Sequence, residues 1–208
     1  MADVEKTIEV VRAMATAMEE NRKELTRLDS EIGDGDHGTN MNRGFQAALE
    51  RLDGADASTP ADVLKAVSMA LIGKVGGAAG PLYGTAFLRT ATALGDAEEV
   101  SDEAVAAALE AALGGIQQRG KAEAGDKTMV DALVPAVEAA KGVVGSGVGA
   151  VLRAAAEGAA EGAEATVPLT VRRGRASYLG ARAEGHKDPG AASTALLLAA
   201  AADVAEGS

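Results

Sequence analysis

Apolar positions recur along most of the chain with the spacing of an amphipathic helix, and segments rich in glycine or proline interrupt them. Helix-start signals support this pattern, because Ser58-Thr59-Pro60 places a cap before a first-turn proline and Ser101-Asp102-Glu103 places acids in a first turn. The stretch 165–171 has some β character but cannot make a sheet alone, so we interpret it as an extended loop. We predict eight helices, at roughly 3–28, 37–52, 60–74, 79–95, 101–119, 128–142, 146–166 and 189–206.

The composition favours an all-α fold. Hydrophobic residues make up 47% of the chain, but aromatic residues only 2%, and alanine and leucine dominate instead. Alanine is the best helix former, whereas aromatic residues favour strands. Alanine-faced helices can also approach one another closely. With 208 residues the chain suits a single domain, 1–208, and we predict an all-α barrel or bundle of eight antiparallel, up-and-down helices.

The connections between the predicted helices differ in their chemistry. Those after the second, fourth and sixth helices are short, whereas those after the first, third, fifth and seventh are rich in glycine and charged residues. In an up-and-down bundle these four odd-numbered connections share one end. Each leads into a helix N-terminus, where free N–H groups and the helix dipole favour anions. The pattern therefore predicts a site for metal and phosphate at one end of the bundle.

The net charge of the chain limits the kinds of ligand and partner that it can bind. The formal net charge is −11 and no basic patch could track a nucleic acid backbone, so we expect no nucleic acid partner. The negative field would also repel a nucleotide unless divalent metal intervened. There is no cysteine for thiol chemistry. The apolar run 191–203 is too short and alanine-rich for a membrane span, and residues 1–10 are not signal-like, so we expect a cytoplasmic protein without membrane contact.

The segment DSEIGDGDHGTNMNRG (29–44) is the densest polar chemistry in the chain. It contains Asp29, Asp34 and Asp36, interspersed with glycines at 33, 35 and 38. Carboxylate oxygens on a loop suit Mg²⁺, and the glycines let the backbone fold tightly enough for these carboxylates to face one centre. The alternative is a solvated acidic loop in which Asp36 caps the second helix. His37 follows directly, either as a phosphate contact or as part of the cap.

Two later connections carry further candidates. The chain turns through Gly76-Gly77-Ala78-Ala79 into the fourth helix, and such glycine-rich turns offer bare N–H groups to phosphate. The seventh connection carries Arg172, Arg173 and Arg175, which could bind phosphate or an acidic partner; the alternative is a solvent-facing loop that balances local acids. It ends at His186-Lys187-Asp188-Pro189-Gly190, a cap followed by a first-turn proline.

These motifs together resemble the L subunits of dihydroxyacetone kinase, the nucleotide-binding partner in the phosphotransferase-linked form of that enzyme. The matching stretches are DSEIGDGDHGTNMNRGF (29–45), GGAAGPLYGT (76–85), GKAEAGDKTMVDALVP (120–135) and GRASYLGARAEGHKDPGA (174–191). They are long and spread over the whole chain. The resemblance implies a barrel of eight antiparallel helices with the nucleotide at one end, in agreement with the helix count.

The resemblance also implies a set of site residues. Asp29, Asp34 and Asp36 match the aspartates that hold two Mg²⁺ ions bridging the nucleotide phosphates. The positions matching the nucleotide pocket are His37, Gly38, Thr39, Asn40, Ala78, Ala79, Gly120, Met129, Arg175, Asp188, Pro189 and Gly190. Family members usually have serine at the position of Ala79, where this chain keeps only the backbone N–H for such a contact.

The resemblance implies a shared reaction as well. ADP would stay bound as a cofactor, be recharged to ATP by a phosphohistidine carrier subunit (M type), and pass its γ-phosphoryl group to dihydroxyacetone on a separate K subunit. Arg175 is the candidate catalytic residue for stabilising the transferred charge, and we expect a homodimer. Two alternatives stay open: an ATP-dependent L subunit acting with another ketose or acyl substrate, and a regulator that binds a transcription factor according to its nucleotide state.

Overall fold

Residues 3–172 and 183–207 of a computed structural model are described, and this part of the chain forms nine α-helices. They are α1 Val4–Glu20, α2 Arg22–Ile32, α3 His37–Asp53, α4 Pro60–Lys74, α5 Ala79–Leu94, α6 Asp102–Gly120, α7 Met129–Gly142, α8 Val148–Ala165 and α9 Pro189–Glu206. The all-α prediction is confirmed, and the second to eighth predicted helices begin and end within about two residues of α3–α9. None of the described helices is long and apolar enough to cross a membrane.

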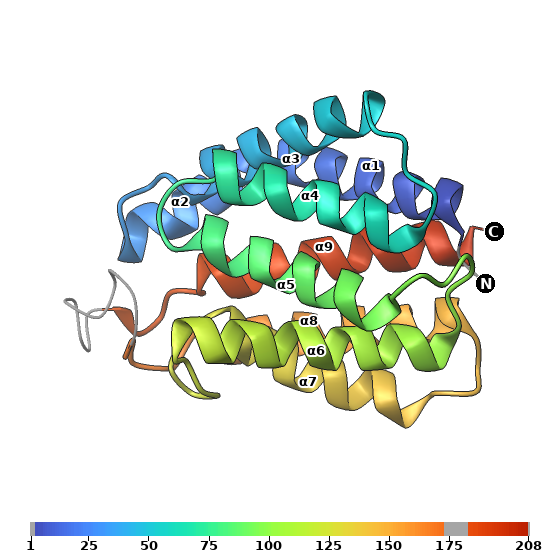
Figure 1. The fold of residues 1–208 in the computed structure, drawn as a ribbon. Coiled ribbons are helices and arrows are strands. Elements are labelled where there is room, and N and C mark those ends of the chain that lie inside the picture. The colour runs from blue at the N-terminus through green and yellow to red at the C-terminus, as the bar shows by residue number, and fades with distance from the viewer. Residues whose placement is uncertain (1–2, 173–182, 208) are drawn as a thin grey trace.

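The helices form an up-and-down barrel. Each of α3 to α8 packs against the next helix along the chain, while α1 contacts both α3 and α9 and so closes the ring. The α2–α3, α4–α5, α6–α7 and α8–α9 connections all lie at one end, on the left in Figure 1, and the chain termini lie at the other. The prediction that the four chemically rich connections share one end is therefore confirmed.

The first predicted helix, 3–28, is divided at Asn21. The Asn21 side-chain amide donates to the carbonyl of Ala17 at 2.9 Å, and its backbone N–H bonds to the same oxygen at 3.1 Å. Asparagine favours such local bonds over continued helix, so α1 ends at Glu20 and α2 begins at Arg22. Because α2 continues to Ile32, Asp29 lies in the last turn of a helix and not on the loop.

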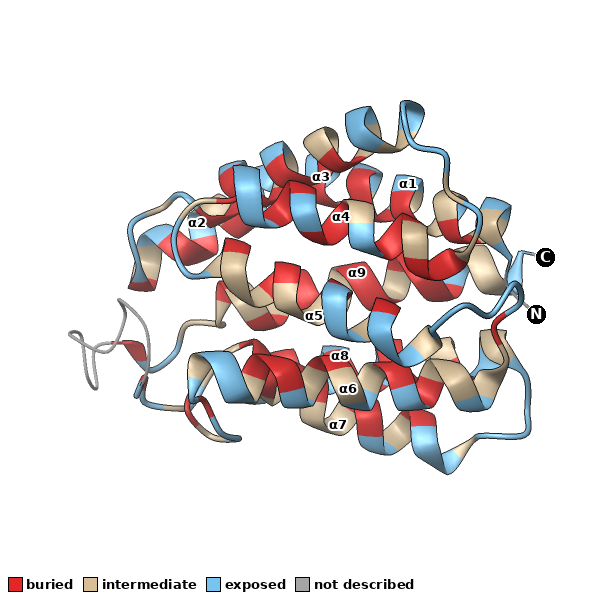
Figure 2. Ribbon diagram, viewed as in Figure 1, coloured by how far each residue is buried: buried red, intermediate tan, exposed pale blue. Residues whose placement is uncertain are grey.

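Small residues let the helices approach closely, as the alanine content indicated, and the buried positions face the inside of the barrel (Figure 2). The contact between α7 and α8 is the clearest case. Pro135 lies inside α7 and has no N–H to donate to the carbonyl of Asp131. A Cβ on Gly162 of α8 would overlap that carbonyl oxygen, so only glycine allows the backbone of α8 to lie against it.

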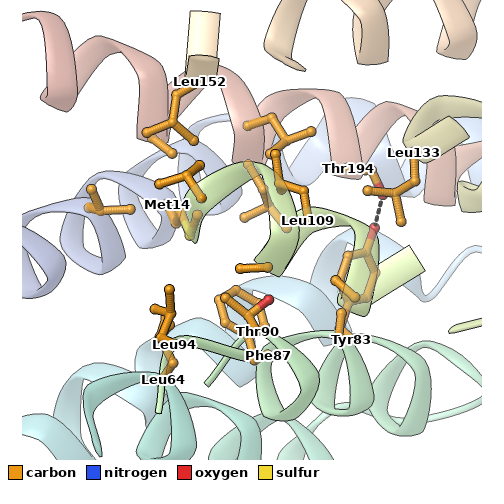
Figure 3. Close-up of a pocket in the computed structure, with 18 of the residues that line it drawn as sticks. Met14, Leu64, Tyr83, Phe87, Thr90, Leu94, Leu109, Leu133, Leu152 and Thr194 are labelled. Carbon is orange, nitrogen blue, oxygen red and sulfur yellow. Dashed lines mark hydrogen bonds between the residues drawn. The ribbon is translucent and has the colours of Figure 1, made fainter. Parts of the chain in front are cut away.

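The barrel interior retains an apolar cavity of about 190 Å³ (Figure 3). Its lining comes from α1 and from α4 to α9, and includes Met14, Leu64, Phe87, Leu109 and Leu152. The core has few aromatic rings, because the chain contains only two Phe and two Tyr, and shorter side chains do not fill the space.

Gly114 offers a test of helix propensity without a change in packing. It lies exposed inside α6, its φ is not positive, and a Cβ added there would meet no atom within 4 Å. We expect Gly114→Ala to stabilise the fold by about 0.5–1 kcal/mol, because alanine loses less backbone entropy in a helix. Thermal unfolding should show a melting temperature about 1–4 °C higher. An unchanged or lower value would contradict this account of α6.

Candidate functional site

Three carboxylates meet where α2 gives way to α3. One oxygen from each of Asp29, Asp34 and Asp36 lies within 4.8 Å of the others. Asp29 is buried, whereas the other two are exposed. The Oδ2 atom of Asp29 accepts the backbone N–H groups of Asp36 at 2.8 Å and of His37 at 3.1 Å. The Asp29 carboxylate therefore folds the loop back onto the end of α2, which brings the acids together.

Glycines make this fold possible, as the sequence predicted. A Cβ on Gly33 would overlap Oδ1 of Asp29, so a larger residue would displace the buried carboxylate. Gly35 has φ +72°, in the left-handed region that glycine adopts without strain. Gly38, in the first turn of α3, lies against the backbone of α2 at Arg22 and leaves no room for a side chain.

A cavity of about 620 Å³ opens beside these acids, at the end of the barrel where the four rich connections meet. Its walls include the starts of α3, α5, α7 and α9. The predicted site residues among its lining are Asp29, Asp34, Asp36, His37, Asn40, Ala78, Ala79, Gly120, Met129, Asp188, Pro189 and Gly190. The structure thus brings together residues that are up to 161 positions apart, from Asp29 to Gly190.

The four helix starts differ in how they are capped. At α7, Thr128 and Asp131 form a capping box, and at α9 the carboxylate of Asp188 accepts the N–H of Ala191 at 2.7 Å. By contrast, neither Asp36 at the start of α3 nor Ala78 at the start of α5 makes a side-chain capping bond. The first turn of α5, and the first turn of α3 beyond His37, whose N–H is bonded to Asp29, therefore keep N–H groups for an anion in the cavity.

A buried hydrogen-bond network holds the imidazole of His37 in place. Nε2 of His37 lies 2.8 Å from Oγ of Ser193, and that oxygen lies 2.7 Å from the hydroxyl of Tyr83. The Tyr83 hydroxyl also donates to the carbonyl of Gly190 at 2.9 Å and lies 2.9 Å from Oγ1 of Thr194 (Figure 3). Tyr83, Ile116 and Met129 line both this cavity and the apolar one, so these three side chains lie between the two.

Burial sets the charge of this network. It lowers the pKa of His37, against the opposing effect of the Asp29 and Asp36 carboxylates, so the imidazole is neutral at pH 7. Burial raises the pKa of Tyr83 to about 12, so the phenol keeps its proton. The network of His37, Ser193 and Tyr83 is therefore uncharged at pH 7.

Asn40 is held in place by its neighbours. Nη2 of Arg43 donates to its Oδ1 at 2.6 Å, while Nε of Arg43 donates to the carbonyl of Lys74 at 2.9 Å. The Asn40 amide nitrogen faces Gly76, where a Cβ would lie only 3.0 Å away. Arg43 thus connects the start of α3 to the end of α4, and the Asn40 amide lies between the α3 and α5 walls.

Two of the predicted residues that the structure describes are not among the cavity lining. Gly38 is buried against α2, and Thr39 is exposed on α3. Arg175, predicted to bind nucleotide and to act in catalysis, lies outside the described residues, as does Arg173 of the same basic cluster.

Sequence reasoning missed several residues of the cavity and its floor, among them Tyr83, Arg119 and Ser193. Tyr83 follows Ala79 by four positions, so helical spacing places it on the face of α5 that carries Ala79. Ser193 follows Gly190 by three positions in α9 and could have been found in the same way.

Asp188 makes the stability of the nucleotide-free protein depend on pH. Burial, with a further contribution from Asp131, raises the pKa of Asp188 from 3.8 to about 7. Between these values the folded protein holds a proton that the unfolded chain has lost, so the free energy of unfolding falls as pH rises. Relative to Asp188→Asn, which does not ionise, the wild-type melting temperature should fall between about pH 4 and pH 7. A constant difference across that range would contradict the shift.

Comparisons with known proteins support the same kind of site. Residues 31–203 match the DAK2 domain family. The chain is 43% identical over 182 residues to the ADP-binding subunit DhaL of PEP-dependent dihydroxyacetone kinase 1 of Listeria innocua, covering 86% of both chains. It is 42% identical over 176 residues to the corresponding Escherichia coli subunit, covering 84% of both. The dihydroxyacetone kinase of C. freundii in complex with AMP-PNP and Mg²⁺ superposes with a TM-score of 0.72 at 25% identity, over 98% of this chain and 34% of that one.

Proposed function

The chain belongs to the DAK2 domain family, and on this premise we propose that it is the ADP-binding subunit of a phosphoenolpyruvate-dependent dihydroxyacetone kinase. The observation that carries the proposal is a single cavity that joins a three-carboxylate cluster to the N-termini of α3 and α5, neither of which is capped by the side chain of its own N-cap residue. An anion site beside clustered acids is what a nucleotide held through divalent metal requires.

The residues of the acidic cluster fit Mg²⁺. All three candidate donors are carboxylates, and their oxygens lie close enough for a common centre. Gly33 leaves room for the Asp29 carboxylate on the side of the cluster. Asp29, Asp34 and Asp36 would therefore hold the metal, two ions by the family resemblance. Bound Mg²⁺ would neutralise phosphate charge and orient the phosphate oxygens.

The protein groups around the cluster would bind and orient the nucleotide. Backbone N–H groups in the first turns of α3 and α5 donate to phosphate without adding charge. The neutral imidazole of His37, held by Ser193, offers a donor or an acceptor that pH does not change near neutrality. Tyr83, together with Ile116 and Met129, lies between this cavity and the apolar interior.

Calorimetric titration tests the binding part of the proposal. ADP should bind the purified protein with Mg²⁺ present, and binding should disappear when EDTA removes the metal. The absence of binding with Mg²⁺ would overturn the proposal. Identifying any nucleotide released on denaturation would show whether ADP co-purifies.

A reconstituted assay tests the activity. The protein is combined with a dihydroxyacetone-binding subunit and a phosphohistidine carrier, and formation of dihydroxyacetone phosphate is measured. Turnover should require all components and phosphoenolpyruvate. Equal turnover with ATP in place of phosphoenolpyruvate and carrier would instead identify an ATP-dependent kinase subunit.

Several expectations stay predictions within this proposal. They are the K subunit and M-type carrier as partners, a transcription regulator as an alternative partner, a homodimer, a cytoplasmic location and the role of Arg175 in transfer. Arg175→Ala should leave ADP and Mg²⁺ in place yet slow transfer; unaltered turnover would dismiss that role.

A further inference from the structure

Lys127 is a buried charged residue on the connection between α6 and α7. Its exposed fraction is 1%, and it is the one buried lysine or arginine among the described residues. Its backbone is in the left-handed region, with φ +62°. Burying a flexible cation in a strained backbone conformation is costly unless its surroundings compensate. The contacts of its side chain therefore need a specific explanation.

The ammonium group of Lys127 is bound by backbone carbonyls. Nζ donates to the carbonyls of Val167 at 3.3 Å, Leu169 at 3.0 Å and Ala183 at 2.8 Å. An ammonium group has three N–H donors, so each one has an acceptor. Although Lys127 lies in the wall of the nucleotide cavity, no donor is left for phosphate. Its role is therefore not that of a phosphate-binding lysine.

The three carbonyls belong to the two described ends of the α8–α9 connection. Val167 and Leu169 follow α8, whereas Ala183 precedes α9. Two backbone bonds join the same segments, from Gly185 N–H to the Val167 carbonyl at 2.9 Å and from Arg172 N–H to the carbonyl of Asp126 at 3.2 Å. The Lys127 side chain thus holds both ends of this connection against the start of α7.

These segments support two walls of the nucleotide cavity. On one side Lys127 directly precedes Thr128 and Met129, and on the other the α8–α9 connection leads into Gly190. The walls touch, since a Cβ on Gly190 would lie 3.6 Å from Cβ of Met129. Ala183 also packs with Ile32 of α2, next to the acidic cluster. The Lys127 ammonium group is where these parts of the site are joined.

We propose that Lys127 is a positioning residue of the nucleotide site, which fixes the α7 and α9 walls relative to each other by binding three carbonyls of the α8–α9 connection. The inference rests on the proposed function, because the ligand that reports on the walls is ADP with Mg²⁺. A lysine with a merely structural role would affect stability but leave the ADP affinity of the folded protein unchanged.

Replacing the ammonium group alone tests this role. The chain has no cysteine, so Lys127→Cys introduces a unique thiol. Alkylation in denaturant with 2-bromoethylamine, followed by refolding, restores an ammonium group at the length of lysine. Alkylation with 1-bromopropane gives a side chain of the same length that ends in a methyl group. We expect the aminoethyl form to bind ADP with Mg²⁺ like the wild type, and the folded propyl form at least about tenfold more weakly.

Lys121→Cys, alkylated in the same two ways, is the matched control. Lys121 lies on the same connection with φ +54° but is exposed and outside the cavity lining. Both of its alkylated forms should bind ADP within twofold of wild type, about the scatter of such measurements. If wild type binds ADP and the folded propyl form of Lys127→Cys binds equally well, the positioning role is overturned and the proposed function stands. If wild type binds no ADP, the proposed function itself fails.

Hydrogen exchange in the unaltered protein provides a second test that does not depend on refolding. If Lys127 couples the α7 and α9 walls, binding of ADP and Mg²⁺ should reduce the motion of both walls. Arg172 and Gly185 lie outside the cavity lining. Their backbone N–H groups nevertheless bond the segments that Lys127 joins, so their hydrogen exchange should slow when ADP and Mg²⁺ bind. Unchanged exchange at both amides, with ADP bound, would overturn the proposal.

Discussion

Replacing Asp34 or Asp36 by asparagine is expected to abolish measurable ADP binding while leaving the fold intact. Each substitution removes one negative charge from the cluster, and metal ligation by a hard cation depends on that charge. Even residues that only support metal ligands account for 10- to 100-fold in affinity, so the loss here should be on the order of 100-fold or more. Both side chains are exposed, so the melting temperature without nucleotide should change little.

Calorimetric titration of ADP with Mg²⁺ measures this effect, with circular dichroism to confirm the helical content. Asp56→Asn is the matched control, because Asp56 is an exposed aspartate in the α3–α4 connection, at the other end of the barrel. It carries the same change of charge and should bind ADP normally. Wild-type affinity in both Asp34→Asn and Asp36→Asn would remove these residues from the metal site.

Gly38→Ala is expected to damage both the fold and the site. A Cβ at this position would overlap the carbonyl oxygen of Arg22 and lie 2.7 Å from the amide nitrogen of Thr26. Both atoms belong to the backbone of α2, which cannot yield as a flexible side chain would. The first turn of α3 would have to move away from α2, which separates Asp36 and His37 from the Asp29 carboxylate that accepts their N–H groups.

Overpacking of this kind typically costs about 1–3 kcal/mol, more than the gain from alanine propensity. We therefore expect a lower melting temperature together with weaker ADP binding at temperatures where the variant is folded. Gly114→Ala makes the same chemical change in open space and should raise the melting temperature without affecting ADP. An equal response from the two glycines would show that the α2–α3 contact does not constrain the site.

Helix positions were predictable because their determinants are local. Thr59 and Asp62 form the capping box that starts α4, and Asp188 with Pro189 starts α9, within a residue or two of the predicted boundaries. The division at Asn21 was missed because one asparagine in an otherwise helical pattern is a weak signal. The predicted end of the first helix at residue 28 was also too early, so Asp29 was placed on a loop although it lies at the end of α2.

The acidic cluster was predictable for the same reason, since Asp29, Asp34 and Asp36 are close along the chain and glycines between them permit a tight fold. The network beneath His37 was not, because its partner Ser193 is 156 residues away. Alternation of plain and chemically rich connections predicted that four helix starts would share one end. It could not show which of them are left uncapped, because capping depends on side-chain rotamers.

The sequence by itself therefore determined the helices, their up-and-down order and the group of residues that face one end of the barrel. The tertiary structure alone decided how these residues are supported: the carbonyls that bind Lys127, the floor formed by Tyr83, and the apolar cavity behind it. The physical reason is the distance along the chain over which the two kinds of interaction act. Helix formation and capping depend on neighbours within a few residues, whereas a buried contact depends on how complete helices pack against one another.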